Sequence, residues 1–259
     1  MEKVNISSKF NKGTVVISVD DGSVEDFRIC QDILFPLNVP ATFNIITDSI
    51  GHESCLNKEQ LKVMYNNSLV EIAAHGHTHS NDDEDILKGI DLLNEWLGIP
   101  KKDIGFASPY SKMSNDSIRE NKEHLKTLGL LYARTDQNRY PNDRHRELIT
   151  KFKNSGERQF VIDNTPQLTY AFDGMCVNSA VVLHDTNLED LKRVVDLAEE
   201  EKACIVFMFH RISKKGEPKY ESTWSYDFDY FKEFAEYIAK KRNNGEIEIL
   251  TTKEAFLWN

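Results

Sequence analysis

Two short polar stretches contain residue types that could bind a metal or act as acid and base. The stretch "HGHTHS" at residues 75–80 holds three of the eight histidines in the chain. The stretch "SVDDGS" at residues 18–23 holds two adjacent aspartates followed by a glycine. Neutral imidazoles suit zinc, and an open catalytic zinc site typically has three protein ligands and a water molecule. The histidine stretch therefore favours a metal site over a purely structural role.

The histidines that would bind a metal depend on where the preceding apolar run, "LVEIAA", stops. Alternate side chains of a strand share a face, so a continuing strand would bring His75, His77 and His79 together. If the chain instead turns helically at Gly76, His75 and His79 meet and His77 faces away. The residue pattern alone leaves both arrangements open.

The two aspartates follow another apolar run, "TVVISV". On a regular strand Asp20 and Asp21 would point to opposite faces, but a sharp turn at Gly22 would let both enter one pocket. Asp-Gly is also ordinary turn chemistry, so this stretch alone does not decide between a site and a turn. A phosphatase would need an aspartate two positions after its nucleophile, and neither aspartate has one.

The elements that must position these residues alternate along the chain. Short apolar, β-branched runs predict strands at 14–19, 41–46, 69–74, 103–107, 130–134, 179–184, 204–209 and 247–250. Helical periodicity predicts helices at 24–35, 57–65, 81–98, 115–128, 188–202 and 227–242, while residues 136–176 form a less regular stretch. This order predicts an α/β fold with a parallel sheet covered by helices, either a barrel or a doubly wound sheet. In both folds catalytic groups collect where strands end.

Composition narrows the classes of protein that fit. The 259 residues contain no internal repeat and no Pro/Gly/Ser-rich linker, so we expect a single domain over residues 1–259. The net charge of −10 and the short, scattered basic runs exclude a nucleic-acid partner, and no apolar run has membrane-spanning length. The opening residues lack the apolar segment of a secretory signal, which predicts a cytoplasmic protein. The cysteines at 30, 55, 176 and 204 lack CxxC spacing and are predicted to be free thiols.

Four segments together resemble a known family. "SVDDG", "EIAAHGHTHSN", "FASPYS" and "FMFHRIS", in this order, are similar to the motifs of the polysaccharide deacetylase family, the NodB-homology domains of carbohydrate esterase family 4. The resemblance runs from about residue 14 to residue 256. It implies a distorted (β/α) barrel of about seven parallel strands. It also implies a divalent metal, usually Zn²⁺, bound by one aspartate and two histidines, and removal of an acetyl group from an acetylated sugar.

The resemblance also assigns roles to residues of the first three motifs. Asp20 would be the general base and Asp21 a metal ligand. His75 and His79 match the His-x-x-x-His pair of the family, which leaves His77 as a neighbour. In the third motif, Pro109 and Tyr110 would present a backbone N–H to the oxyanion. These roles suit amide hydrolysis, because an amide is a poor electrophile and needs both a polarising metal and a base for the attacking water.

Two histidines compete for the role of general acid. His210 in "VFMFHRIS" and His184 in "VVLHDTN" each resemble a form of the last family motif. After His210 come one helix, one strand and "TTKEAF", which is how sequences of this family usually close. We therefore expect His210 to be the acid and His184 to end the preceding strand.

The third motif departs from the family pattern. It usually begins with an arginine that pairs with the base, and here that position is Ala107. An unpaired carboxylate in a closed pocket would have a raised pKa, so another cation should hold Asp20. Arg134 is the first candidate and Arg211 the second. The aspartate motif with a tryptophan, common in the family, is also missing. Residues 136–176, which include Tyr140, Arg144 and Phe172, could then shape a different substrate pocket.

The sequence thus predicts a zinc-dependent carbohydrate deacetylase, a hydrolase of carbon–nitrogen bonds. Its expected partners are an acetylated sugar, a sugar nucleotide or a carrier-linked glycan, rather than mature cell-wall polymer. Two alternatives stay open at this stage. One is an O-acetyl esterase or deformylase that uses the same metal site. The other is a catalytically silent sugar-binding module, which the missing arginine makes conceivable.

Overall fold

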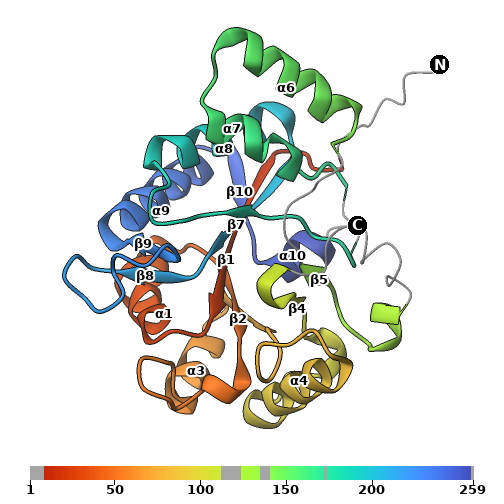
Figure 1. Cartoon of the computed structure of the whole chain (residues 1–259), viewed down its shortest axis with the longest axis vertical. Helices are drawn as coiled ribbons and strands as arrows, with labels where there is room; N and C mark the ends of the chain where they lie inside the picture. Colours follow the sequence, from red (N-terminus) through yellow and green to blue (C-terminus); the bar gives the residue numbers. More distant parts are fainter. Residues whose placement is uncertain (1–8, 112–123, 135–140, 172–173, 258–259) are drawn as a thin grey trace.

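A curled parallel sheet lies at the centre of the molecule, with helices around it (Figure 1). The structure is a computed structural model and describes residues 9–111, 124–134, 141–171 and 174–257. The strands of the sheet are β1 (Gly13–Asp21), β2 (Ala41–Ile45), β3 (Val70–Ala74), β4 (Phe106–Ala107), β5 (Ala133–Arg134), β6 (Ala180–Val181), β7 (Cys204–Phe209) and β10 (Ile247–Ile249). They follow the order β5-β4-β3-β2-β1-β7-β6, with β10 beside β1, and every pair is parallel.

The two edges of this sheet approach each other at residues 177–181. Val177 forms a parallel bridge with Arg134 of β5, and β6 follows three residues later and pairs with β7. In the middle of the sheet, β1 pairs with β7 along one side. Along its other side, the first half of β1 pairs with β10 and the second half with β2. The predicted distorted (β/α) barrel of about seven parallel strands is therefore confirmed.

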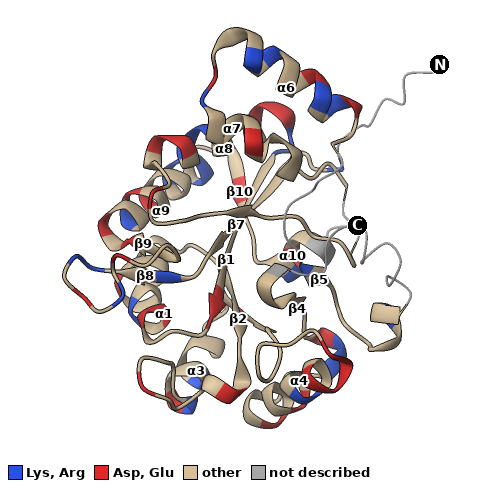
Figure 2. Ribbon diagram, viewed as in Figure 1, with Lys and Arg blue, Asp and Glu red and all other residues tan. Residues whose placement is uncertain are grey.

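The helices cover the outer face of the sheet. They are α1 (Val24–Ile29), α2 (Phe35–Leu37), α3 (Lys58–Tyr65), α4 (Asp83–Leu97), α6 (Asp143–Ser155), α7 (Gln159–Asn164), α8 (Leu188–Glu201), α9 (Phe228–Asn243) and α10 (Thr252–Leu257). A π-helical turn at Cys30–Leu34 joins α1 and α2. Acidic and basic residues lie mostly on these outer helices, whereas the end of β1 carries acidic residues at the centre of the molecule (Figure 2). A separate pair of short strands, β8 (Arg211–Ser213) and β9 (Ser225–Asp227), follows β7.

Helix α4 shows why the sequence pattern was informative in the first half of the chain. Ile86, Ile90 and Leu93 recur at helical spacing and are buried against the sheet. The helix begins after Asp82 and ends at Gly98, whose φ of 73° is the left-handed conformation that glycine adopts at low cost. Of the predicted helix at 115–128, residues 124–127 are helical and residues 112–123 lie outside the described part of the chain.

The prediction of a less regular stretch at 136–176 was wrong, because this segment contains α6 and α7. The buried stripe of α6 consists of only His145, Leu148 and Phe152, so its apolar periodicity is weak. Its start is a capping box in which Asn142 and His145 bond each other's backbone N–H. Since this motif normally carries Glu or Gln at the third helical position, the pair gave no recognisable start signal.

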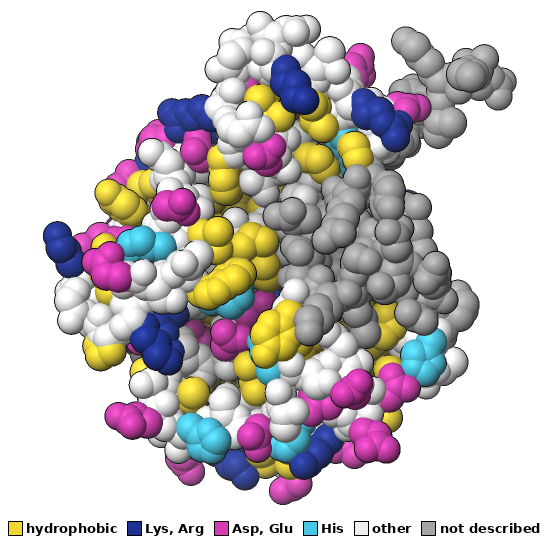
Figure 3. Space-filling view, in the orientation of Figure 1, with side chains coloured by type: hydrophobic (Ala, Val, Ile, Leu, Met, Phe, Trp, Pro, Cys, Tyr) yellow, Lys and Arg dark blue, Asp and Glu magenta, His cyan; other side chains and the backbone are white. Residues whose placement is uncertain are grey.

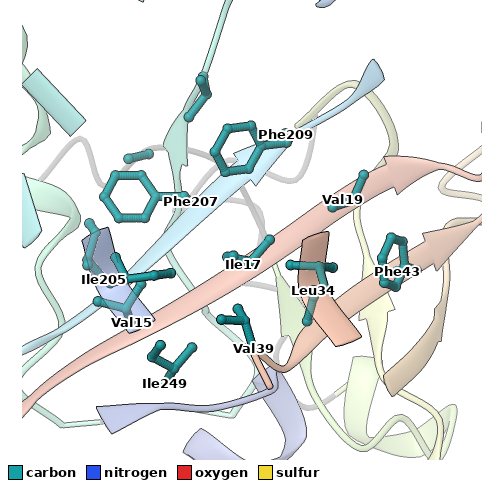
Figure 4. Close-up of a cluster of buried hydrophobic side chains, with 14 of the residues drawn as sticks. Val15, Ile17, Val19, Leu34, Val39, Phe43, Ile205, Phe207, Phe209 and Ile249 are labelled. Carbon is teal, nitrogen blue, oxygen red and sulfur yellow. The ribbon is translucent and has the colours of Figure 1, made fainter. Parts of the chain in front are cut away.

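The core is formed by apolar side chains of the central strands and the helices packed on them (Figure 4). Val15, Ile17 and Val19 of β1 lie next to Phe207 and Phe209 of β7, and all five are fully buried. Burial of one such side chain contributes roughly 1.5–3 kcal/mol, so these strands are the stable platform from which the polar ends project. The four cysteines are unpaired, as predicted. Among the described helices, none combines the length and the apolar character needed to cross a membrane.

Candidate metal centre and active site

Polar side chains gather where β1, β3, β4 and β7 end. A cavity of about 720 Å³ opens there, a volume typical of small-molecule sites. Histidine and acidic side chains lie at the centre of this face between hydrophobic ones (Figure 3). The lining consists of Asp20, Asp21, His75, His79, Ser108, Tyr110, Phe160, Asp163, Asn164, Val181, Leu183, Met208, His210 and Trp224. The carboxyl ends of the strands thus form the candidate site, as expected for a barrel.

Asp21, His75 and His79 form a group that could hold a metal ion. The Nε2 atoms of His75 and His79 lie 3.1 Å apart, and Oδ1 of Asp21 lies 3.6 Å and 3.9 Å from them. Ligands on a tetrahedral zinc at about 2.0–2.2 Å are separated by roughly 3.3–3.6 Å. Oδ1 of Asp21 is also buried and accepts no hydrogen bond within the described part of the chain. The donor set and its spacing therefore fit a divalent ion such as zinc.

The orientation of His75 supports this fit. Its Nδ1 lies 2.8 Å from the carbonyl oxygen of Ala107, so Nδ1 carries the proton and Nε2 keeps a lone pair toward His79 and Asp21. A backbone acceptor on the far nitrogen is the usual way in which a protein fixes a metal-binding tautomer.

The backbone has unusual φ angles at two of the three candidate ligands, Asp21 and His79. Asp21 has a φ of 82° and His79 a φ of 64°, values that residues other than glycine rarely adopt. Gly22, at 77°, continues the turn after Asp21. As anticipated, this turn lets Asp20 and Asp21 face one cavity, although the left-handed residue is Asp21 itself as well as Gly22. Such strained positions cluster at functional sites.

The loop at residues 76–80 is held by Asp85 on the first turn of α4. The carboxylate of Asp85 accepts hydrogen bonds from the backbone N–H groups of His77, Thr78 and Ser80, at 2.7–3.2 Å, and from the Thr78 hydroxyl at 2.7 Å. Gly76 is required next to it, because a Cβ there would lie 2.6 Å from Oδ2 of Asp85. The loop is therefore a turn wrapped around one carboxylate rather than the helical turn or the continuing strand considered from the sequence.

His77 lies on the other side of this turn. Its Nδ1 is 3.0 Å from the hydroxyl of Thr47, and its Nε2 is 3.7 Å from Asp48. The structure thus brings His75 and His79 together and directs His77 away. This is the side-chain arrangement expected from the helical alternative, although the backbone reaches it through a turn that is not helical.

Asp20 and Arg134 form a buried ion pair beside the metal ligands. Nη2 of Arg134 lies 2.6 Å and 2.5 Å from the two carboxylate oxygens of Asp20, and both side chains are 2% exposed. Asn44 of β2, the register partner of Asp20, donates a further hydrogen bond at 2.8 Å. Arg211, the second candidate, instead pairs with Glu25. The structure therefore provides a cation for Asp20 and shows that it comes from β5.

The register of the sheet explains how Arg134 reaches this position. Ala107 of β4 and Arg134 of β5 are direct partners on neighbouring parallel strands. Ala107 is the position at which the motif resemblance led us to expect an arginine, and the guanidinium instead comes from the neighbouring strand β5. Burial alone would raise the pKa of Asp20, but the charge of Arg134, with smaller contributions from His75 and His210, holds the pKa below its ordinary value. Asp20 is therefore ionised at neutral pH.

His210, and not His184, lines the cavity. His210 follows β7 directly and is close enough to Asp20 and Asp21 for their charges to favour its protonated form, although burial has the larger effect and lowers its pKa. His184 lies outside the cavity lining, 3.6 Å from Glu221 and edge-on to the ring of Tyr220. The geometry thus places the expected acid at the site and gives the competing histidine different neighbours.

The third motif is tied to the histidine loop by Asn81. The Asn81 side chain donates to the carbonyl oxygen of Pro109 at 3.0 Å and accepts from the hydroxyl of Ser108 at 2.9 Å. Tyr110 has a φ of 55° and its ring packs on that of His79, with centroids 4.2 Å apart. Pro109 itself does not line the cavity, whereas Tyr110 does. The motif is therefore at the site, with Tyr110 as its contribution to the cavity wall.

Several residues at the site were not anticipated from the sequence. Asn44 could have been noticed as a polar residue inside an apolar strand, and Asp85 as one of several acids at the start of a helix. Trp224 had no signal, because it lies on a loop between two short strands. Conversely, Arg144 was predicted to be a possible residue of the substrate pocket, but it pairs with Glu201 on the outer surface. Tyr140 and Phe172, considered with it, lie outside the described residues.

The fold and the site together define a class: a distorted (β/α) barrel with an Asp-His-His cluster at the carboxyl ends of its strands. Residues 7–128 match the family model described as polysaccharide deacetylase. This region is therefore similar to the polysaccharide deacetylase family, as its motifs indicated. The match ends before Arg134 and His210, so their proposed roles depend on the geometry described above.

Curated relatives agree with this family. A poly-beta-1,6-N-acetyl-D-glucosamine N-deacetylase of Staphylococcus aureus (strain MRSA252) is 28% identical over 144 residues, which cover 48% of each chain. The protein of the same name from Staphylococcus epidermidis is 28% identical over 156 residues, or 52% of each chain. The match thus spans about half the length of these relatives. Among solved structures, the Bc1960 peptidoglycan N-acetylglucosamine deacetylase has a TM-score of 0.52 at 17% identity, over 96% of this chain and 91% of that one, which supports the fold.

Proposed function

We propose that this protein is a metal-dependent deacetylase that hydrolyses the N-acetyl group of an amino sugar. The observation that carries the proposal is the grouping of Asp21, His75 and His79 beside the buried ion pair of Asp20 and Arg134. The match of residues 7–128 to the polysaccharide deacetylase family model supports the reaction. The staphylococcal relatives, which are named for deacetylation of poly-N-acetylglucosamine, support an amino sugar as the substrate.

The metal would be held by Oδ1 of Asp21 and the Nε2 atoms of His75 and His79, and zinc suits this mixed nitrogen and oxygen set. When bound, a divalent ion supplies two effects, polarisation of the acyl carbonyl and a lowered pKa of a bound water. The hydrogen bond from Nδ1 of His75 to Ala107 leaves Nε2 free to bind the metal, and the turn around Asp85 holds His79 beside His75.

Asp20 and His210 would then each carry out one of the two proton transfers of the reaction. Asp20, kept ionised by Arg134 and oriented by Asn44, accepts the proton of the attacking water. The water oxygen forms a bond to the acetyl carbon, and the bond from that carbon to the sugar nitrogen breaks. His210 donates a proton to the departing nitrogen. Burial lowers the pKa of His210, and the charges of Asp20 and Asp21 act in the opposite direction and favour the protonated form that this step requires. The products are acetate and a free amine.

The proposal is tested by the substitution Asp20→Asn. We expect acetate release to fall by about 10²–10⁴-fold, which is the usual contribution of general-base catalysis. Metal content, measured by elemental analysis, should persist because the three ligand atoms are unchanged. The matched control is Asp48→Asn, an exposed carboxylate 3.7 Å from His77, which should leave acetate release unaltered. Undiminished acetate release by Asp20→Asn would refute the assignment of the base.

Two neighbouring activities use the same chemistry and are separated by a panel of substrates. An O-acetyl esterase would prefer O-acetylated sugars, and a deformylase would release formate rather than acetate. The panel should include N-acetylglucosamine oligomers, a sugar nucleotide and a carrier-linked sugar, since each carries the same acetamido group. A catalytically silent sugar-binding module would bind members of the panel with saturation yet release neither acid with any divalent metal.

A further inference from the structure

A second layer of polar side chains lies inside the barrel, nearer the amino-terminal ends of the strands than the candidate site. Its members are buried, and they are Thr42 of β2, Glu71 of β3 and Tyr132, which directly precedes β5. Each stands two or four residues before a residue of the site in the same extended segment, namely Asn44, His75 and Arg134. Because side chains alternate along a strand, each member of this lower layer faces the same way as the site residue that follows it.

Hydrogen bonds join the lower layer into one unit. One carboxylate oxygen of Glu71 accepts from the hydroxyl of Tyr132 at 2.9 Å, and the other accepts from the hydroxyl of Thr42 at 2.8 Å. The second oxygen also accepts from the backbone N–H of Lys253, in the first turn of α10, at 2.8 Å. A buried carboxylate whose bonds are satisfied holds its donors firmly, so Glu71 fixes the relative positions of β2, β3 and the start of β5.

The ring of Tyr132 lies against a bare stretch of backbone. Gly105 directly precedes β4, and a Cβ at this position would lie 2.1 Å from two atoms of the Tyr132 ring, which would have to move. Two residues later, Ala107 is the register partner of Arg134. The segment through β4 thus carries two minimal side chains, Gly105 and Ala107, beside the two large side chains of the segment through β5.

The position of β5 decides where the guanidinium of Arg134 lies. The strand is two residues long, and its pairing consists of two residue pairs with β4 and one bridge to Val177. Apart from its contacts with Asp20, the guanidinium donates one longer hydrogen bond, from Nη1 to the hydroxyl of Ser179 at 3.2 Å. Its Nε is buried and has no acceptor within the described part of the chain. The guanidinium is therefore oriented mainly by Asp20 and by the backbone that carries it.

We propose that Tyr132 is a positioning residue for the buried pair of Asp20 and Arg134, and that Glu71 is its anchor. The bond between the Tyr132 hydroxyl and Glu71 holds the start of β5, so that the guanidinium two residues later meets both oxygens of Asp20. Tyr132 does not line the cavity, so it acts on the reaction through Arg134. The effect on turnover rests on the proposed deacetylation, whereas the effect on Arg134 needs no substrate.

The kinetic test uses Tyr132→Phe, which removes one hydroxyl and keeps the ring against Gly105. We expect kcat for acetate release from a tetramer of N-acetylglucosamine to fall about tenfold and KM to change less than about twofold, because a misplaced catalytic group slows the reaction without altering the cavity. In the Arg134→Met background the same substitution should change kcat by less than about twofold, because the positioned group is absent. The control is Tyr170→Phe, which should leave kcat unchanged, because Tyr170 is also buried and its hydroxyl donates to Glu201 outside the cavity lining.

A spectroscopic test needs no turnover. The side-chain N–H signals of Arg134 in a proton–nitrogen correlation spectrum, assigned by their loss in Arg134→Lys, report the ion pair directly. They should shift in Tyr132→Phe and stay in place in Tyr170→Phe.

The two measurements separate the positioning role from the reaction. Unshifted Arg134 signals in Tyr132→Phe would overturn the role, and so would a kcat that is unchanged or that falls equally in the wild-type and Arg134→Met backgrounds. Shifted signals in a protein that releases no acetate with any divalent metal would sustain the role of Tyr132 toward Arg134 and contradict the deacetylase proposal.

Discussion

Arg134 carries a full charge in the interior, and Asp20 is the residue that compensates it. Removing one partner of such a pair leaves a buried charge unpaired, which is costlier than removing both. We expect Arg134→Met to lower the free energy of unfolding by about 3–5 kcal/mol. The double variant Asp20→Asn/Arg134→Met should be less destabilised than the sum of the two single variants.

Urea denaturation of the four proteins completes the cycle and yields the coupling energy directly. Strict additivity would show that the two side chains do not interact in solution. The comparison needs no substrate, so it stands independently of the proposed reaction.

Glu71 is a second buried charge, and it provides a pH-dependent prediction. Its carboxylate accepts hydrogen bonds from Thr42, Tyr132 and the backbone of Lys253, at 2.8–2.9 Å. Burial has the largest effect and raises its pKa above the ordinary value of 4.5, although the hydrogen bonds act in the opposite direction. A raised pKa in the folded state means that the contribution to stability is complete below pH 4.5 and is lost as the pH rises through the folded pKa.

The substitution Glu71→Gln removes this titration. We expect the stability of the wild type relative to Glu71→Gln to decrease as the pH rises from about 4.5 toward neutrality. Urea denaturation at several pH values measures this difference. A difference that stays constant over the whole range, or that grows with pH, would show that the folded pKa of Glu71 is not raised.

At the scale of elements, the link between α4 and the histidine loop makes Asp85 important for metal affinity. Burial would raise the pKa of Asp85, but hydrogen bonds from Thr78, Ser80 and His77 outweigh it and lower the pKa, so the carboxylate is charged when it holds the loop. Asp85→Asn replaces one acceptor oxygen by an N–H₂ group that faces other donors. We expect metal affinity to fall about 10–100-fold, as for other residues that orient ligands.

A chelator competition titration measures this loss. The matched control is Asp83→Asn on the same turn of α4, because the carboxylate of Asp83 pairs with His124. Unchanged affinity in Asp85→Asn, or equal loss in both variants, would contradict the role given to Asp85.

The elements also show where sequence interpretation reached its limit. Buried parallel strands such as β1 and β7 are continuous apolar runs, so their ends, and with them Asp20, Asp21 and His210, could be located from the sequence. Helix α6 could not, because its buried stripe is narrow and its cap uses His145. Asn44 contacts Asp20 because of the register between β1 and β2, and Asp85 contacts the histidine loop because α4 packs against it. Such contacts between distant residues cannot be predicted from a single sequence.

On the scale of the whole molecule, the candidate metal centre joins segments more than fifty positions apart, the end of β1 and the loop after β3. An ion that binds only the folded chain stabilises it by mass action, by about 2.7 kcal/mol at a free concentration of 100 times its Kd. For a chain of this size such a gain raises Tm by roughly 5–10 °C.

We therefore expect chelation to lower Tm by this amount and added zinc to restore it. Differential scanning calorimetry measures the shift, and His79→Ala should abolish it while His77→Ala retains it. If His77→Ala loses the shift and His79→Ala keeps it, the metal is held by the strand-like arrangement and not by the turn.

The pairing of Ala107 with Arg134 across β4 and β5 has a consequence for how homologues are compared. A guanidinium can change its place in the primary structure while keeping its place in the tertiary structure, provided that it moves to the adjacent strand at the same height. If the family has an arginine at position 107, as the motif resemblance implies, column-by-column comparison of homologues would score Ala107 as a loss and would class chains of this kind as degenerate. Comparison by spatial equivalence would retain them, and inactive members inferred from the first criterion alone merit re-examination by the second.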